Sequence, residues 1–182
     1  MDLIHETAKP ATDWPGPAIQ FGGQVVALDD LQHPRNRRGL DLWQTSRGAR
    51  PFPARAEFTP RVLREYLRNM ALVRVIGNAQ DFEFRIVGDA IVSTQGGHMQ
   101  GLTCTQLDEV LPGYGSELSA VYRHVCGTKI PLALRGSYVR QADGMAIIHE
   151  SLVMPLGVDD AAVDHLLVVG AIGHTLEDML RS

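Results

Sequence analysis

Two cysteines and the histidines near them are the residues of this chain best suited to chemistry. Cys126 follows His124 by two positions, which is the nearest approach to a nucleophile beside a base. Side chains two residues apart on a helix point in different directions, and no Cys-x-x-Cys spacing of the kind used by zinc sites is present. We therefore expect Cys104 and Cys126 to be inert, buried thiols, and we predict neither catalytic residues nor a metal site.

Polar residues within apolar strands form a second set that could bind a molecule. Residues 132–140 and 145–155 have the composition of strands, and alternation places Arg135 and Tyr138 on opposite faces of the first. A pocket against a sheet is mostly apolar, with a few placed polar groups. The candidate pocket residues are Tyr122, Arg135, Tyr138 and His149.

The same strands allow a second interpretation. Arg135 and Glu150 would form a cross-strand ion pair on an outward face, worth only ~0.2–1 kcal/mol. The sequence leaves both alternatives open.

A sheet and a helix must position these side chains. Residues 71–77 and 82–87 predict a hairpin, because each is rich in strand-forming residues and a turn-rich segment separates them. The alternation of the second strand ends at Gly88, and Asp89 can then accept the free amides at the start of a short helix.

The remaining elements follow in order. Thr103 and Gln106 have capping-box spacing for another short helix, and residues 116–125 predict a longer amphipathic helix that carries Tyr122. Residues 165–172 are almost all apolar, so we expect this last strand at the centre of the sheet, covered on both faces.

The N-terminal part of the chain differs in composition. Prolines and glycines interrupt residues 1–32, which we predict to be a flexible leader with at most a short strand over residues 24–28. Residues 33–70 are expected to form a helical extension, and residues 71–176 to form the domain proper.

Two helices, over residues 34–47 and 59–70, are predicted within this extension. Each carries an apolar stripe that must cover either the sheet of its own chain or a second subunit. The candidate dimer-interface residues are Trp43, Val62, Tyr66 and Met70.

Composition excludes several classes of protein. The 182 residues suit one domain with an extension, and the formal net charge of −4 is not that of a nucleic-acid binder. No apolar segment approaches the ~20 residues that a membrane helix needs. The first residues lack the basic and apolar regions of a signal peptide, so we expect a cytoplasmic protein.

The order of two strands, a helical crossover and three antiparallel strands resembles a PAS domain. Residues 85–91 and 99–102 resemble the second strand, first short helix and glycine turn of PAS sequences. More narrowly, the chain is similar to the stand-alone PAS proteins of alphaproteobacteria. It has their Trp-containing helix at residues 40–43, their G-x-x-x-P step at Gly127–Pro131, and their glutamate, apolar run and Pro-Leu end at Glu150–Leu156.

This resemblance covers roughly residues 35–175 and implies a fold as well as a function. The implied fold is α/β (α+β), a five-stranded antiparallel sheet with a helical crossover and an N-terminal helical extension. PAS domains sense small ligands or cofactors, or mediate protein contacts, through a pocket between sheet and crossover. The resemblance therefore implies a sensory or regulatory module in signal transduction.

The cofactor and the ligand stay unidentified. Cys104 does not stand in the setting of the reactive cysteine of flavin photosensors, and haem would need an axial ligand such as His98 or His124. The sequence disfavours both cofactors. We expect a non-enzymatic homodimer that binds a small molecule or an unidentified signalling protein, but neither nucleic acid nor membrane.

Two other functions remain as alternatives. The first is a ligand-free protein interaction module, for dimerisation or as an adaptor, whose core is filled by side chains. The second, which we favour least, is a small enzyme that uses Cys126 or His149.

Overall fold

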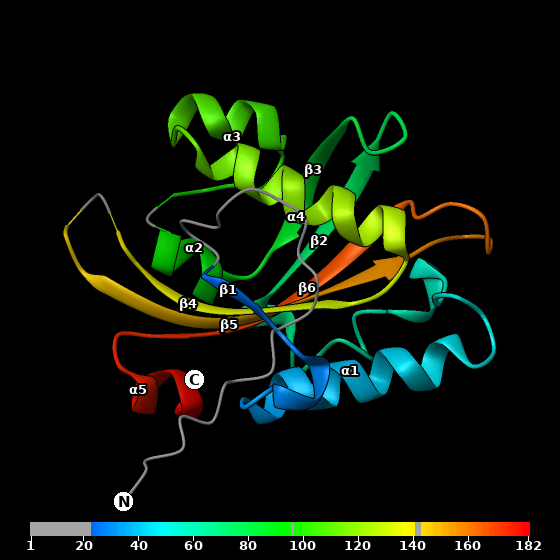
Figure 1. Ribbon diagram of the computed structural model, residues 1–182, viewed down its shortest axis with the longest axis horizontal. Coiled ribbons are helices and arrows are strands. Elements are labelled where there is room, and N and C mark those ends of the chain that lie inside the picture. Colours follow the sequence, from blue (N-terminus) through cyan, green and yellow to red (C-terminus); the bar gives the residue numbers. More distant parts are fainter. Residues whose placement is uncertain (1–22, 96, 141–142) are drawn as a thin grey trace, which may run out of the picture.

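An antiparallel sheet forms the middle of the computed structural model, which describes residues 23–95, 97–140 and 143–182 (Figure 1). The strands are β1 (Gln24–Val26), β2 (Met70–Ile76), β3 (Asp81–Val87), β4 (Leu132–Val139), β5 (Ala146–Leu156) and β6 (His165–Gly173). The helices are α1 (Pro34–Arg47), α2 (Asp89–Gln95), α3 (Cys104–Val110), α4 (Tyr114–Thr128) and α5 (Leu176–Arg181). Short 3-10 turns are η1 (Leu28–Asp30), η2 (Arg55–Glu57) and η3 (Leu67–Asn69). The sheet order is β1-β4-β5-β6-β2-β3.

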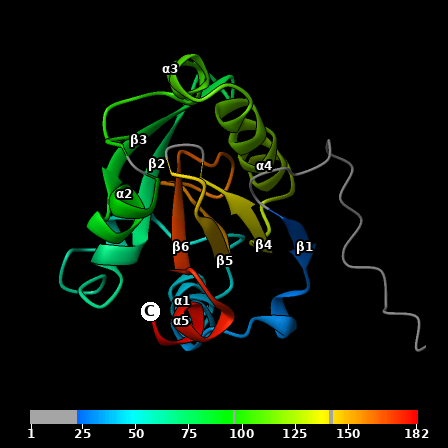
Figure 2. The same cartoon turned by 90° about the vertical axis from the view of Figure 1, so that its left-hand side faces the viewer.

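Helices cover both faces of this sheet (Figure 2). The crossover helices α2, α3 and α4 lie over one face, whereas α1 and α5 lie against the other. Each face has its own apolar core, and β5 and β6 contribute side chains to both. The strands at the centre of the sheet are therefore buried on two sides, as the apolar composition of β6 predicts.

Local chemistry fixes the start of two crossover helices. Thr103 Oγ1 accepts a hydrogen bond from the Gln106 amide at 3.2 Å, and the Gln106 side chain accepts one from the Thr103 amide at 2.9 Å. This confirms the capping box ahead of α3. At Gly88, a Cβ atom would lie 2.3 Å from the Arg68 carbonyl oxygen, so only glycine allows β3 to turn into α2 so close to η3.

The helix expected over residues 34–47 is confirmed as α1, but the one expected over residues 59–70 is wrong. Turns and η3 occupy that segment, where the Tyr66 amide donates to the Leu63 carbonyl and the Asn69 amide to the Tyr66 carbonyl. These bonds span three residues, as in 3-10 rather than α-helical structure. The segment ends because Met70 already pairs with Val169 of β6 as the first residue of β2.

Part of the expected leader is ordered as a strand. Gln24, Val25 and Val26 pair with β4, which adds a sixth strand to the five that were expected. Residues 1–22 of the expected leader lie outside the described residues. The short helix α5, which the sequence analysis missed, packs against β6 and buries Met179.

The candidate dimer-interface residues lie mostly inside the chain. Trp43, Tyr66 and Met70 are buried in the core between the sheet and α1, and the Trp43 indole nitrogen donates to the Pro155 carbonyl oxygen at 2.8 Å. Only Val62 of this set is exposed. The expected stripe therefore covers the chain's own sheet, which was the first of the two arrangements that it allowed.

None of the described helices has the length and apolar character needed to cross a bilayer.

Replacing Trp43 with alanine should lower the free energy of unfolding by about 3–5 kcal/mol, because it removes a large core side chain. Urea denaturation measures this loss. Val62→Ala is the control and should stay within about 0.5 kcal/mol of the wild type. An unchanged stability for Trp43→Ala, together with a lower mass by light scattering, would instead place Trp43 between subunits.

Candidate ligand pocket

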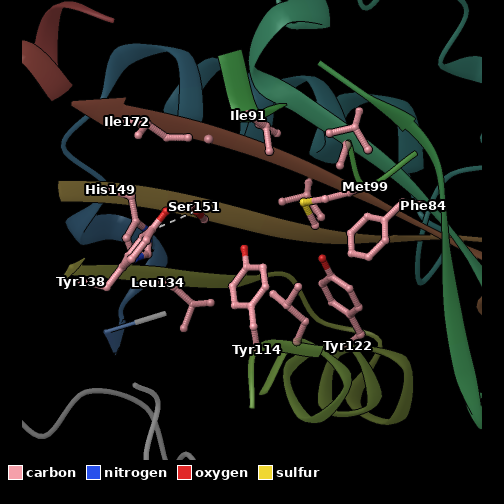
Figure 3. A pocket seen from close by; sticks show the side chains of 15 residues that line it. Phe84, Ile91, Met99, Tyr114, Tyr122, Leu134, Tyr138, His149, Ser151 and Ile172 are labelled. Atoms are coloured by element: carbon pink, nitrogen blue, oxygen red, sulfur yellow. Dashed lines mark hydrogen bonds between the residues drawn. The ribbon is translucent and has the colours of Figure 1, made fainter. Parts of the chain in front are cut away.

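A cavity of about 100 Å³ lies between the sheet and the crossover helices (Figure 3). Strands β2 to β6 and helices α2 and α4 contribute to its wall. Most of this wall is apolar, and its larger apolar residues are Phe84, Ile91, Met99, Leu134 and Ile172. The site thus continues the apolar core on this face of the sheet.

Polar groups enter the cavity from two sides. His149 and Ser151 project from β5, where His149 Nδ1 lies 3.3 Å from Ser151 Oγ. The ring of Tyr138, on the neighbouring strand β4, lies 6.0 Å from the His149 ring. Tyr114 and Tyr122 come from α4, and their hydroxyl groups point into the cavity (Figure 3). The cavity therefore offers hydrogen bonds at both ends of an apolar space.

Tyr122 is the more deeply buried of the two tyrosines that α4 contributes. Its side chain is 3% exposed, and its ring makes edge-to-face contacts with Phe82 and Phe84 at centroid distances of 5.3 and 6.4 Å. Burial raises the pKa of the Tyr122 phenol well above its ordinary value, so the group stays neutral and can donate a hydrogen bond. Its hydroxyl points into the cavity, where it can donate to a bound molecule (Figure 3).

Among the residues that the structure describes, no Asp, Glu, Lys or Arg lines the cavity. Its titratable groups are the three tyrosines and His149. A molecule held there would meet hydroxyl groups and one imidazole within an apolar wall.

Three of the four candidate pocket residues lie together in this wall, and one does not. Tyr122, Tyr138 and His149 line the cavity. Arg135 lies on the opposite face of β4, where its guanidinium binds Glu150. The cross-strand ion pair that the sequence left open is therefore present, although it is buried under α1 and not on an outward face.

Glu150 is fully buried on the face of the sheet opposite the cavity. Its Oε2 accepts hydrogen bonds from the Arg135 guanidinium at 2.7 Å and from the Gln32 amide at 2.8 Å. Its Oε1 accepts from the His33 amide at 2.9 Å and from Asn36 Nδ2 at 3.1 Å. Because Gln32, His33 and Asn36 flank the start of α1, the carboxylate joins β4 and β5 to the positive end of that helix.

These contacts decide the ionisation of Glu150. Burial alone would raise the pKa of the carboxyl, but the hydrogen bonds from the Gln32 amide, Arg135, the His33 amide and Asn36 outweigh burial, so the pKa lies below its ordinary value. The group is therefore ionised throughout the physiological range.

The two thiols have the character that the sequence predicts. Burial raises the pKa of Cys104 to about 12 and that of Cys126 to about 11, so almost no reactive thiolate forms near neutral pH. Within the described residues, no cluster of His, Cys, Asp and Glu side chains could hold a metal ion.

Comparison with known proteins agrees with this architecture. Residues 31–172 match a family described as PAS domain. The chain belongs to the PAS domain family. The expected PAS-like α/β fold is confirmed, with the sixth strand that β1 adds. As members of this family act in sensing and signalling, the protein is a PAS-type sensory or signalling module.

Solved structures match about two thirds of this chain. One is the PAS domain of Bordetella pertussis BvgS, with a TM-score of 0.52 and 14% sequence identity over 69% of this chain and 91% of that one. Another is an RNA-binding light-oxygen-voltage receptor, with a TM-score of 0.43 and 19% identity over 65% of this chain and 35% of that one. No curated protein matches the sequence significantly.

Sequence reasoning missed two polar residues of the pocket. Ser151 follows His149 by two positions on β5 and so shares its face, a signal that alternation could have supplied. Tyr114 precedes Tyr122 by eight residues, close to two helical turns, so the two side chains share a face of α4. Tyr114 was missed because the predicted helix starts at residue 116, two residues after the true start of α4.

Replacing Glu150 with glutamine should lower the free energy of unfolding by about 3 kcal/mol at pH 7. This is the lower end of the ~3–5 kcal/mol for breaking a buried ion pair, because Arg135 still reaches solvent. The folded-state pKa of Glu150 lies below its unfolded value near 4.5, so its contribution is complete above that pH and is lost as the pH falls through the folded value. Urea denaturation at several pH values should show the wild type and the variant converging in acid.

Glu177→Gln is the matched control, since the pair of Glu177 with Arg181 is exposed. We expect it to stay within about 0.5 kcal/mol of the wild type at pH 7. A difference between wild type and Glu150→Gln that does not change between pH 7 and pH 3 would contradict the role of the carboxylate.

Proposed function

We propose that this protein senses a small molecule in the cavity and passes the signal to a partner protein. The observation that carries the proposal is the cavity itself. An empty space of about 100 Å³ in a core costs on the order of 2 kcal/mol at ~24 cal/mol per Å³, and larger apolar side chains would remove that cost. A bound molecule would recover it, which favours ligand binding over a filled core.

The route for the signal follows from the alternation of β5. His149 and Ser151 face the cavity, whereas Glu150 between them faces α1. Leu134 and Arg135 divide β4 in the same way. A molecule that shifts these strands by a few tenths of an ångström would change the lengths of the hydrogen bonds of Glu150. The position of α1 on the sheet would change with them.

The finer features of the function belong to this proposal. The protein acts in the cytoplasm without catalysis, as a homodimer, and belongs with the stand-alone PAS proteins of alphaproteobacteria. Its output goes to an unidentified signalling protein, not to nucleic acid or a membrane. For the dimer interface, Val62 is the candidate residue that remains exposed.

The second candidate function is a ligand-free interaction module. The observation that favours it is the packing of Trp43, Tyr66 and Met70, which fill the core between the sheet and α1 with side chains of the chain itself. The two functions differ in one measurable property, which is whether the cavity is occupied.

Native mass spectrometry of freshly purified protein should show an added mass that disappears on denaturation. Gly170 lines the cavity, and a Cβ atom there would meet its nearest neighbours only at ordinary contact distances of 3.8 Å and more. Gly170→Ile should therefore fill the space, abolish the added mass and raise the free energy of unfolding of the ligand-free protein by about 0.5–2 kcal/mol.

Gly39→Ala is the control on the opposite face, where a Cβ atom also meets only ordinary contacts. It should keep the added mass. A bare mass for the wild type in buffers and in cell extract alike would favour the ligand-free interaction module.

A further inference from the structure

The size of the cavity limits its ligand. Cavities of about 150 Å³ lined by apolar side chains take up benzene. The present cavity, at about 100 Å³, is somewhat smaller, but Met99 in its wall is an adaptable side chain that can move aside for a ring. With Met99 moved aside, one ring with a short substituent is the largest molecule that this space takes, whereas a flavin, a haem or a nucleotide is too large.

The wall also limits the charge of the ligand. Among the described residues, no Asp, Glu, Lys or Arg lines the cavity, and the ion pair of Arg135 with Glu150 lies on the other face of the sheet. Transfer of an ion from water into an apolar site without a counterion is strongly unfavourable. A neutral molecule is therefore favoured over an ionised carboxylate or amine of equal size.

The Tyr122 hydroxyl supplies a specific contact. It is protonated, and it points into the cavity (Figure 3). A ligand that offers an acceptor to this hydroxyl gains a hydrogen bond that a ligand without an acceptor cannot make. Phe84 lies beside Tyr122 and presents its ring to the same space, which suits an aromatic ligand.

We propose that the cavity binds an uncharged, single-ring or similarly compact apolar molecule of about six to nine heavy atoms, whose one hydrogen-bond acceptor receives the Tyr122 hydroxyl. This inference rests on the proposed function and specifies the ligand class of the same site.

Three probes of equal size and shape test the inference: acetophenone, cumene and benzoate. All have nine heavy atoms, since each is a benzene ring with a three-atom branched substituent. Acetophenone is neutral with an acceptor, cumene is neutral without one, and benzoate is ionised at pH 8. Titration followed by NMR and calorimetry gives the affinity of each probe for the full chain.

We expect acetophenone and cumene to bind and benzoate to bind at least 100-fold more weakly than acetophenone. Tyr122→Phe should weaken acetophenone about tenfold and leave cumene unchanged, because only the ketone loses a hydrogen bond. Because each probe is compared between the wild type and Tyr122→Phe, the difference in hydrophobicity between acetophenone and cumene cancels. Tyr66→Phe, on the opposite face of the sheet, should change neither affinity, and circular dichroism checks that both variants fold.

Each of the contrary results would overturn one part of the proposal. Equal effects of Tyr122→Phe on acetophenone and cumene would overturn the role of Tyr122, and benzoate binding as tightly as acetophenone would overturn the neutral class. If no probe binds while native mass spectrometry shows another molecule, the ligand class is wrong and the proposed function stands. If no probe binds and no added mass exists, both are wrong.

Discussion

The carboxylate of Glu150 joins three parts of the chain that are distant in sequence. It lies in β5, one of the two central strands of the sheet, binds Arg135 from the neighbouring strand, and accepts hydrogen bonds from backbone amides of the segment that leads into α1. A buried charge is tolerated only when donors surround it, so the position of this segment is specified by the need to satisfy the carboxylate. Apolar packing of Trp43 alone would allow α1 to slide along the sheet, whereas the directed hydrogen bonds do not.

This constraint leaves the other face of the same strands free for a different task. The crossover helices do not fill the space above β4 and β5, and Tyr122 reaches into it from α4. The two faces therefore divide the work of the sheet. The face toward α1 contributes stability through the hydrogen-bonded carboxylate of Glu150. The face toward the crossover helices contains the cavity, which a small molecule can occupy.

Much of this arrangement could be predicted from sequence, because it depends on local periodicity. Alternation found Tyr138 and His149, and helical spacing found Tyr122. Alternation alone does not show which face of β4 lines a pocket. Arg135 was therefore a candidate, although it lies on the face opposite Tyr138. The apolar spacing of residues 63–70 fits 3-10 turns as well as a helix, and β1 and α5 are short elements that exist only through tertiary pairing. The cavity depends on how the side-chain volumes pack in three dimensions, and the spacing of residue types along the sequence does not predict it.

The placement of His149, Glu150 and Ser151 on alternate faces of one strand has a consequence for evolution and engineering. Substitutions at 149 and 151 change the recognition surface without touching the groups that fix α1, and those at 150 do the reverse. Specificity and fold can thus vary independently within three consecutive codons. A library restricted to positions 149 and 151 would diversify the recognised chemistry while leaving the contacts of Glu150 in place, which is the property sought in a starting point for biosensors.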